Sequence, residues 1–179
     1  MLAELKKLRS CHTSKICQAL LTVISDKSKP IEVRRCALEA AAPLNLPQVK
    51  KAIIKAYQSH NAKLRTSAIY AMGKNCNRSW LPVLIKELSN ANILIRYEAA
   101  GACGELGEEE AVPYLLELIN DPDGDVQVAA IQALGKIGGT EAKGCLKQCL
   151  NDVNEVIREA AEQALNELVA GEDPFSFRV

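Results

Sequence analysis

Apolar and small residues recur along the chain with a period of 31 residues. Five aliphatic anchors are spaced by this period: Val33, Leu64, Ile95, Val126 and Ile157. Alanine follows every anchor at offsets 4 and 7: Ala37, Ala40, Ala68, Ala71, Ala99, Ala102, Ala130, Ala133, Ala161 and Ala164. Offsets 0, 4 and 7 lie on one face of an α-helix. A fixed period of this length predicts a stack of repeats, each too small to bury its apolar face alone.

Residues 110–138 show how one repeat is built. Apolar positions at helical spacing predict a first helix, which opens with acidic residues and a proline that a first turn tolerates. Residues 120–124, Asn-Asp-Pro-Asp-Gly, have the composition of a turn that ends this helix and caps the next. A second helix then buries Val126, Ala130, Ala133, Leu134 and Ile137, and Gly138 ends it.

The same pattern predicts helix pairs along most of the chain. The expected pairs are 13–25/31–43, 47–58/62–74, 78–89/93–106, 109–120/124–137 and 140–150/155–169. A further N-terminal helix is expected over residues 2–9, because Leu2 lies 31 residues before Val33. We therefore expect an all-α, right-handed α-α superhelix, with residues 1–170 as a single solenoid.

Residues 171–179 are expected to form a C-terminal tail, because Pro174 prevents the last helix from continuing. The tail holds both phenylalanines of the chain, Phe175 and Phe177. It covers the terminal repeat or serves as a docking peptide, and covering is the preferred interpretation because open solenoid ends need caps. The pattern leaves open whether the chain is part of a longer protein.

Three segments carry a resemblance to a known family: Val-Arg-Arg-x-Ala-x-x-Ala at 33–40, Ile-Arg-x-x-Ala-x-x-Ala at 95–102, and 110–138. They resemble HEAT repeats, and more narrowly the short prokaryotic HEAT-like repeats also found in phycobilisome bilin lyases. The resemblance covers residues 13–169 and implies an armadillo-like scaffold. It also implies that the arginine after each anchor pairs with an acidic turn residue, which gives structural roles to Arg34, Arg65, Arg96 and Arg158. Gln127 departs from this pattern and predicts a weaker link there.

The second helices are expected to line the concave side of the solenoid, with offsets 2, 5, 6 and 9 pointing away from the buried face. In the middle repeats these offsets are apolar or amphipathic and are flanked by glycines, which leave room for close backbone approach. We hypothesise a non-enzymatic scaffold that binds a protein partner there. An alternative is that helix packing buries some of these positions. The candidate contact residues are Arg35, Glu39, Thr66, Ile69, Tyr70, Tyr97, Val128, Ile131, Gln132 and Glu159.

Charge is distributed unevenly along a chain whose net charge is zero. Residues 1–90 hold 16 Lys+Arg and 5 Asp+Glu, whereas residues 91–179 hold 6 and 17. This asymmetry supports two further hypotheses, head-to-tail self-association and binding of nucleic acid or another polyanion by the basic half. Protein binding remains preferred, because the acidic half would repel a polyanion. The candidate anion-binding residues are Lys50, Lys51, Lys55 and Lys63.

The sequence offers little for catalysis. Neither His12 nor His60 has a second histidine or a carboxylate at metal-ligand spacing, so we predict no catalytic residue, metal or cofactor. HEAT-repeat hydroxylases that bind iron need paired His-Glu motifs, which this sequence lacks. The resemblance alone leaves a bilin lyase-like accessory protein as an alternative function.

Seven cysteines without framework spacing fit a reducing compartment, and most of them align with apolar core positions. No apolar stretch is long enough to span a membrane. We therefore expect a cytoplasmic protein without a membrane segment. Trp80, the one tryptophan, aligns with small apolar residues and is expected to pack within a first helix.

Overall fold

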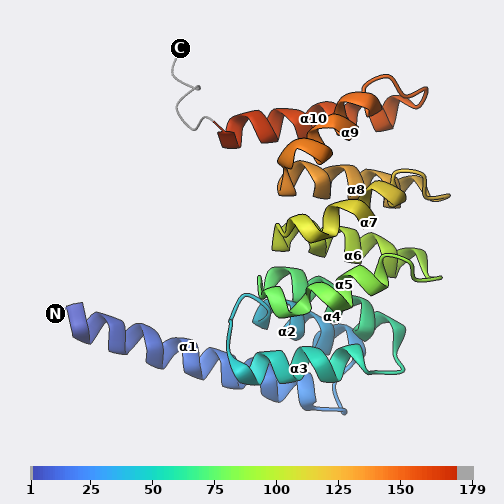
Figure 1. Cartoon of the computed structure of the whole chain (residues 1–179). Coiled ribbons are helices and arrows are strands. Elements are labelled where there is room, and N and C mark those ends of the chain that lie inside the picture. Colours follow the sequence, from blue (N-terminus) through green and yellow to red (C-terminus); the bar gives the residue numbers. More distant parts are fainter. Residues whose placement is uncertain (1, 173–179) are drawn as a thin grey trace. The chain divides into compact units, whose positions relative to one another are not determined.

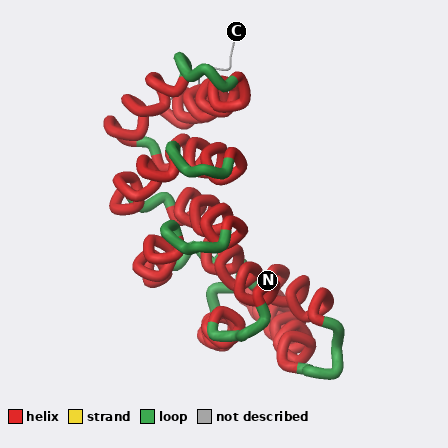
Figure 2. Tube along the Cα trace, turned by 90° about the vertical axis from the view of Figure 1, so that its right-hand side faces the viewer, coloured by secondary structure: helices red, strands yellow, loops and turns green. Residues whose placement is uncertain are grey.

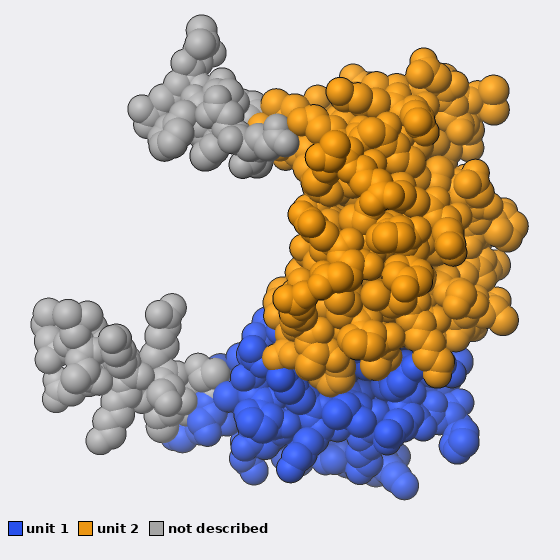
Figure 3. All heavy atoms as spheres, viewed as in Figure 1, with its two compact units in different colours: residues 1–75 blue, residues 76–179 orange. Residues whose placement is uncertain are grey.

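The computed structural model describes residues 2–172, with the side chains of residues 2–13 and 170–172 left out of the description. Over this range the chain is helical throughout and contains no strand (Figure 1). The contacts divide the chain into two compact units, residues 1–75 and 76–179, coloured separately in Figure 3. The single solenoid over residues 1–170 therefore stays a prediction. Of the predicted tail, residues 171–179, the first two residues are helical, and residues 173–179 lie outside the described residues.

Unit 1 contains two helix pairs. Its helices are α1 (Leu2–Ser25), α2 (Ile31–Ala41), α3 (Pro47–Tyr57) and α4 (Ala62–Lys74). Helix α2 packs against α1 and α4, and α3 packs against α4. Residues 2–9 are helical as predicted, but they are continuous with residues 10–25 in α1.

Unit 2 contains three helix pairs joined by short loops (Figure 2). The first helices are α5 (Leu81–Glu87), α7 (Val112–Leu118) and α9 (Gly139–Cys149). The 3₁₀ turns η1 (Arg78–Trp80) and η2 (Glu109–Ala111) precede α5 and α7. The second helices are α6 (Ile93–Leu106), α8 (Gly124–Ile137) and α10 (Glu155–Glu172). These bounds confirm the predicted pairs to within a few residues, and Trp80 is buried as expected.

The alanine pattern explains how the second helices pack. All five offset-4 alanines are buried, and so are the four later offset-7 alanines. Ala40 and its anchor Val33 are instead exposed, which corrects the prediction for the first repeat. The reason is that offset 7 faces the second helix of the preceding repeat, and α2 is the first second helix in the described chain.

Glycine at offset 9 provides the complementary surface for these alanines. A Cβ on Gly104 would lie 2.8 Å from Cα of Ala133, and one on Gly135 would lie 2.7 Å from Cβ of Ala164. The backbones of α6, α8 and α10 therefore approach closely at these contacts. The sequence suggested that glycines around the candidate face leave room for a partner. Gly104 and Gly135 instead leave room for the second helix of the next repeat.

None of the helices described here is long and apolar enough to cross a membrane.

We predict opposite effects from two glycine substitutions on α6. Gly104→Ala should lower the free energy of unfolding by about 1–3 kcal/mol, because its methyl group overlaps Ala133. Gly101→Ala should raise it by about 0.5–1 kcal/mol, because no atom lies within 4 Å of its Cβ and alanine favours the helix. Urea denaturation of both variants checks this, and equal effects would contradict the proposed packing.

Candidate functional site

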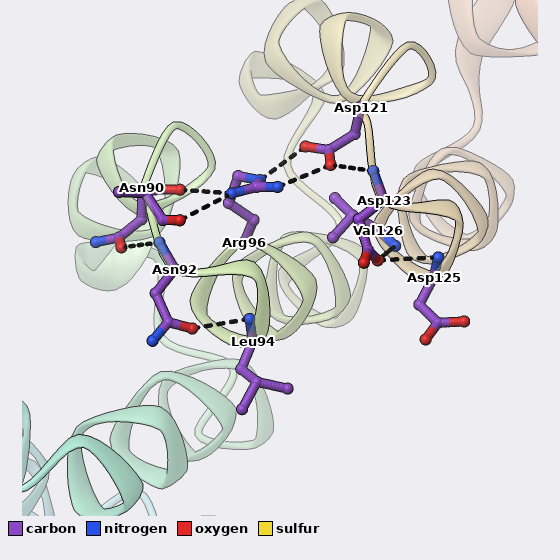
Figure 4. A network of polar contacts seen from close by, with 9 residues as sticks. Asn90, Asn92, Leu94, Arg96, Asp121, Asp123, Asp125 and Val126 are labelled. Carbon is purple, nitrogen blue, oxygen red and sulfur yellow. Dashed lines mark hydrogen bonds and ion pairs between the residues drawn. The ribbon is translucent and has the colours of Figure 1, made fainter.

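Side-chain caps in the turns fix where the second helices of unit 2 begin (Figure 4). The Oδ1 atom of Asn92 accepts a hydrogen bond from the amide of Leu94 at 2.9 Å. Asp123 accepts from the amides of Asp125 and Val126 at 3.1 and 3.2 Å. These residues satisfy amides that the first helical turn leaves without partners. They therefore place Leu94 and Asp125 in the first turns of α6 and α8.

Arg96 joins two of these turns. Its Nη1 donates to the carbonyl of Asn90 at 2.9 Å, and its Nε and Nη2 donate to the two carboxylate oxygens of Asp121 at 2.7 and 2.8 Å. Both side chains are largely buried, with 12% and 7% of their surface exposed. This bidentate pair confirms the structural role that the family resemblance implied for Arg96.

The other arginines that follow an anchor residue make different contacts from Arg96. Arg158 donates to the carbonyls of Asp152 and Val153 in its own turn, at 2.8 and 3.1 Å. In unit 1, Nε of Arg34 donates to the carbonyl of Ile24 at 3.0 Å, and the guanidinium of Arg65 lies 5.3 Å from the Tyr57 ring centroid. These contacts give the arginines structural roles, and for Arg96 the role is the predicted pairing with an acidic turn residue.

Unit 2 exposes apolar side chains along its second helices. Leu94 is 63% exposed, Tyr97 44% and Val156 57%, and Val128 is half-buried. Because α6 packs against α8 and α8 against α10, equivalent positions on these helices are neighbours. Exposed polar residues border them. We call this set the second-helix surface: Leu94, Tyr97, Asp125, Val128, Gln132, Val156 and Glu159.

The structure corrects two apolar candidates. Ile69 and Ile131 are fully buried, although the sequence placed them on the partner-binding face. Both stand at offset 5, on the side of the second helix that also carries the offset-9 glycines. This side packs within the stack instead of facing solvent. The alternative that helix packing buries part of the face is therefore confirmed for these two residues.

The candidate residues of unit 1 are largely used within the unit. Nε of Arg35 donates to Oγ of Ser67 at 3.0 Å, and that hydroxyl donates to Glu39 at 2.6 Å. This network joins α2 to α4, so Arg35 and Glu39 serve its packing. The hydroxyl of Thr66 donates to the carbonyl of Ala62 at 3.0 Å. Tyr70 is 38% exposed, and Nζ of Lys74 lies 5.8 Å from its ring centroid.

The four candidate lysines fall into two groups. Lys51 and Lys55 are exposed on α3, and Lys50 is half-buried beside them. Lys63, on α4, is instead paired with Glu32, with its Nζ 2.6 Å from Oε1. Both side chains of this pair are exposed, 67% for Lys63 and 49% for Glu32, so Lys63 remains a predicted anion-binding residue, although it lies on a different helix from the other three lysines.

Leu94 and Val156 are surface residues that the sequence reasoning missed. Each stands one residue before an anchor, and the search for outward positions began after the anchor. The helical period carried the signal, because offset −1 lies on the same face as offsets 2 and 6.

Cysteine burial agrees with the sequence in part. Cys17, Cys103 and Cys149 are buried, and burial raises the pKa of the Cys103 thiol to about 12. Cys36 and Cys76 are exposed, so the prediction that most cysteines fill apolar core positions does not extend to these two. Among the described residues, no group of three or more His, Cys, Asp or Glu side chains is placed to hold a metal ion.

Comparison with known proteins places this architecture in a class. Residues 81–166, just under half of the chain, match the family of HEAT repeats. By fold, the described helix pairs are similar to those of HEAT and armadillo repeat proteins, which are α-α solenoids. No curated protein sequence matches the chain.

Three solved structures illustrate the likeness. A chain of the complex of CpcE and CpcF of phycocyanin lyase from Nostoc sp. PCC7120 has a TM-score of 0.69 and 22% identity, covering 88% of this chain and 66% of that one, just under two thirds. A designed armadillo repeat protein in complex with the peptide (KR)4 has a TM-score of 0.59 and 19% identity, covering 87% of this chain and 85% of that one. Human deoxyhypusine hydroxylase in complex with glycerol has a TM-score of 0.53 and 20% identity, covering 90% of this chain and 76% of that one. At these identities the likeness concerns the fold.

We predict that Asp121→Asn destabilises the chain at neutral pH by about 1.5–3 kcal/mol, because it removes a charged, bidentate partner of Arg96. The hydrogen bond from Arg96 lowers the pKa of Asp121 below its ordinary value of 3.8. The carboxylate therefore stabilises the fold above pH 3.8, and this contribution is lost as the pH falls through the folded-state pKa. Denaturation of both proteins from pH 7 to pH 3 should show the difference narrowing in acid. A constant difference would contradict this account.

We predict that replacing Gln127 can raise the stability of the protein. It stands where Arg96 stands in the preceding repeat, and Asp152 stands where Asp121 does. Gln127→Arg should therefore form the missing link to Asp152 and raise stability by about 1 kcal/mol. The double variant Gln127→Arg with Asp152→Asn is the control, and it should lose most of the gain in thermal unfolding.

Proposed function

We propose that this protein is a non-enzymatic interaction module that binds a protein partner on the second-helix surface of unit 2. The observation that carries the proposal is the exposure of Leu94 and Tyr97 on α6, beside Val128 on α8. Leu94 and Tyr97 are three residues apart and share a helix face. Large apolar side chains exposed together on a rigid scaffold are typical of protein-binding surfaces.

The charge of unit 2 suggests the chemistry of the partner. Residues 76–179 hold 8 Lys+Arg and 18 Asp+Glu. Asp125 and Glu159 lie within the second-helix surface, and Glu155 adjoins it on α10; all three are exposed. We infer a partner segment with apolar anchors flanked by lysine or arginine, which this field attracts. The likeness to a designed armadillo protein bound to the basic peptide (KR)4 supports this inference.

Close helix packing supports binding by a preformed surface. The glycine–alanine contacts hold α6, α8 and α10 together, so the surface residues have little freedom to lose when a partner binds. The complex of CpcE with CpcF is a further HEAT-like example of assembly with a protein. Of the predicted partner-binding face on the second helices, we therefore propose the part that lies in unit 2.

A polyanion remains the second candidate, through Lys51 and Lys55 on α3 of unit 1. Residues 1–75 hold 14 Lys+Arg and 4 Asp+Glu, which would favour nucleic acid. A bilin lyase-like accessory role is the third candidate, and it rests on the fold likeness to phycocyanin lyase. A change in the visible absorbance of an added linear tetrapyrrole would support that role.

We also propose a cytoplasmic location. The six described cysteines are free, including the pair Cys145 and Cys149 on α9, four residues apart. Free thiols persist in reducing compartments.

Affinity capture from lysate tests the main proposal with two matched tyrosine variants. Tyr97 and Tyr114 are both 44% exposed in unit 2, but Tyr97 lies on a second helix and Tyr114 on the first helix α7. Tyr97→Ala should weaken capture of the partner at least about tenfold, as expected for an aromatic anchor. Tyr114→Ala should leave capture unchanged.

Nuclease treatment of half of each sample separates the candidates. A protein partner should survive nuclease and elute with increasing salt, because its basic residues face an acidic surface. Complete loss after nuclease would favour the polyanion candidate. Equal capture by wild type and the Tyr97 variant would overturn the second-helix surface.

A further inference from the structure

Unit 1 contains a cavity whose lining corresponds to that of a cavity in unit 2 at eight of its eleven described positions. The unit 1 cavity has a volume of about 670 Å³ and the unit 2 cavity about 560 Å³. Eight lining positions are related by two repeats, or 62 residues. The pairs are Ile24/Lys86, Lys27/Ser89, Arg34/Arg96, Ala52/Tyr114, Lys55/Glu117, Ala56/Leu118, Ser59/Asp121 and His60/Pro122. The two units therefore offer an internal comparison of one site.

In unit 2 the chain itself supplies an anion to this site. The carboxylate of Asp121 accepts both hydrogen bonds from Arg96, and the side chains of Tyr114 and Leu118 line the same space. In unit 1 these three residues are replaced by smaller ones: Ser59, Ala52 and Ala56. The arginine is kept, as Arg34, but the carboxylate and the apolar bulk are missing.

The unit 1 cavity is lined by more cationic side chains than the unit 2 cavity, in addition to lacking its carboxylates. Lys55 replaces Glu117, Lys27 replaces Ser89, and both lysines are exposed at the rim. Among the described residues that line this cavity, none is acidic.

Two carboxylates lie elsewhere in the neighbourhood of Arg34 along the chain. Asp26 interacts electrostatically with Arg34, but its Oδ1 accepts from the amide and hydroxyl of Ser28 at 2.9 and 2.6 Å. Glu32 pairs with Lys63 and Arg35. Neither carboxylate is among the described residues that line the unit 1 cavity, where Ser59 stands in the place of Asp121.

The cavity wall below the cations is apolar. Ile24, Ala56 and Leu64 are buried, and Leu21 and Ala52 are half-buried beside them. A ligand that fills this space needs an apolar body as well as a negative charge.

We propose that the unit 1 cavity binds a carboxylate carried on a short apolar body. Its carboxylate takes the place of the Asp121 side chain and bonds to the Nη atoms of Arg34, whose Nε already donates to the carbonyl of Ile24. Lys27 and Lys55 add attraction. Its apolar part takes the place of Tyr114 and Leu118. The carboxylate belongs either to a free organic acid or to an acidic side chain of a peptide. This inference concerns unit 1 and stands independently of partner binding by unit 2.

Titration of the full-length protein, followed by NMR amide shifts, tests the proposal with defined probes. Hexanoate represents a free acid, and the blocked peptide acetyl-Leu-Asp-Leu-amide represents a peptide side chain. Hexanol and acetyl-Leu-Asn-Leu-amide are their uncharged counterparts. At least one carboxylate should shift the amides of Lys27, Arg34 and Ser59, and its uncharged counterpart should bind at least about tenfold more weakly.

Ser59→Asp is the decisive variant. Oγ of Ser59 accepts from the amide of Asn61 at 3.1 Å, as Oδ1 of Asp121 accepts from that of Asp123 at 2.9 Å, so aspartate fits the turn. The new carboxylate should occupy Arg34, raise the Tm and weaken carboxylate binding at least about tenfold. Gln58→Glu is the control. Gln58 is exposed, so a glutamate there adds the same negative charge next to Ser59 in the sequence, and it should leave carboxylate binding largely unchanged.

Three results would overturn the proposal. They are no binding of either carboxylate, equal binding of a carboxylate and its uncharged counterpart, and undiminished binding by Ser59→Asp. Binding of the peptide alone would identify a polypeptide as the source of the carboxylate, and binding of hexanoate would identify a free acid. Failure of the tyrosine test in unit 2 leaves these outcomes unaffected.

Discussion

The contact between glycine at offset 9 and alanine at offset 7 is the constraint on which the arrangement of unit 2 depends. Gly104 and Gly135 have no side chain, so Ala133 and Ala164 can approach the backbone of the neighbouring helix. On α6 and α8 this close approach buries offsets 5, 7 and 9 and leaves offsets −1, 2 and 6 toward the outside. The exposed positions then form rows across α6, α8 and α10. A surface for a partner therefore follows from the same packing that stabilises the unit.

The turns between helices are the second level of organisation. In unit 2, Arg96 and Asp121 join successive turns through a largely buried, bidentate pair. The repeat frame keeps an arginine at the equivalent place in unit 1 but replaces the aspartate with Ser59. One position thus serves as an internal structural link in one unit and as a candidate ligand site in the other. Repeat proteins permit this comparison because each repeat reproduces the geometry of its neighbours.

The helices were predictable from the sequence, whereas the exposed surface was predictable only in part. Anchors and alanines at fixed offsets determine where helices begin and which face is buried, and turn residues such as Asn92 and Asp123 mark the boundaries. Burial of Ile69 and Ile131 depends on which side of a second helix meets the next repeat, which a helical period alone does not specify. Exposure of Ala40 reflects its place in the first repeat. The unit 1 cavity has Ser59 where the unit 2 cavity has Asp121, and the sequence alone does not show that this aspartate pairs with Arg96.

Hydrogen–deuterium exchange on the full chain, free and bound to its captured partner, tests the central claim most directly. The account predicts added protection in the N-terminal turns of α6, α8 and α10, where Leu94, Tyr97 and Val156 are exposed and Val128 is half-buried. It predicts little change in the first helices α5, α7 and α9. Protection confined to those first helices, or to α3 with its lysines, would contradict the claim that the second-helix surface of unit 2 is the binding site.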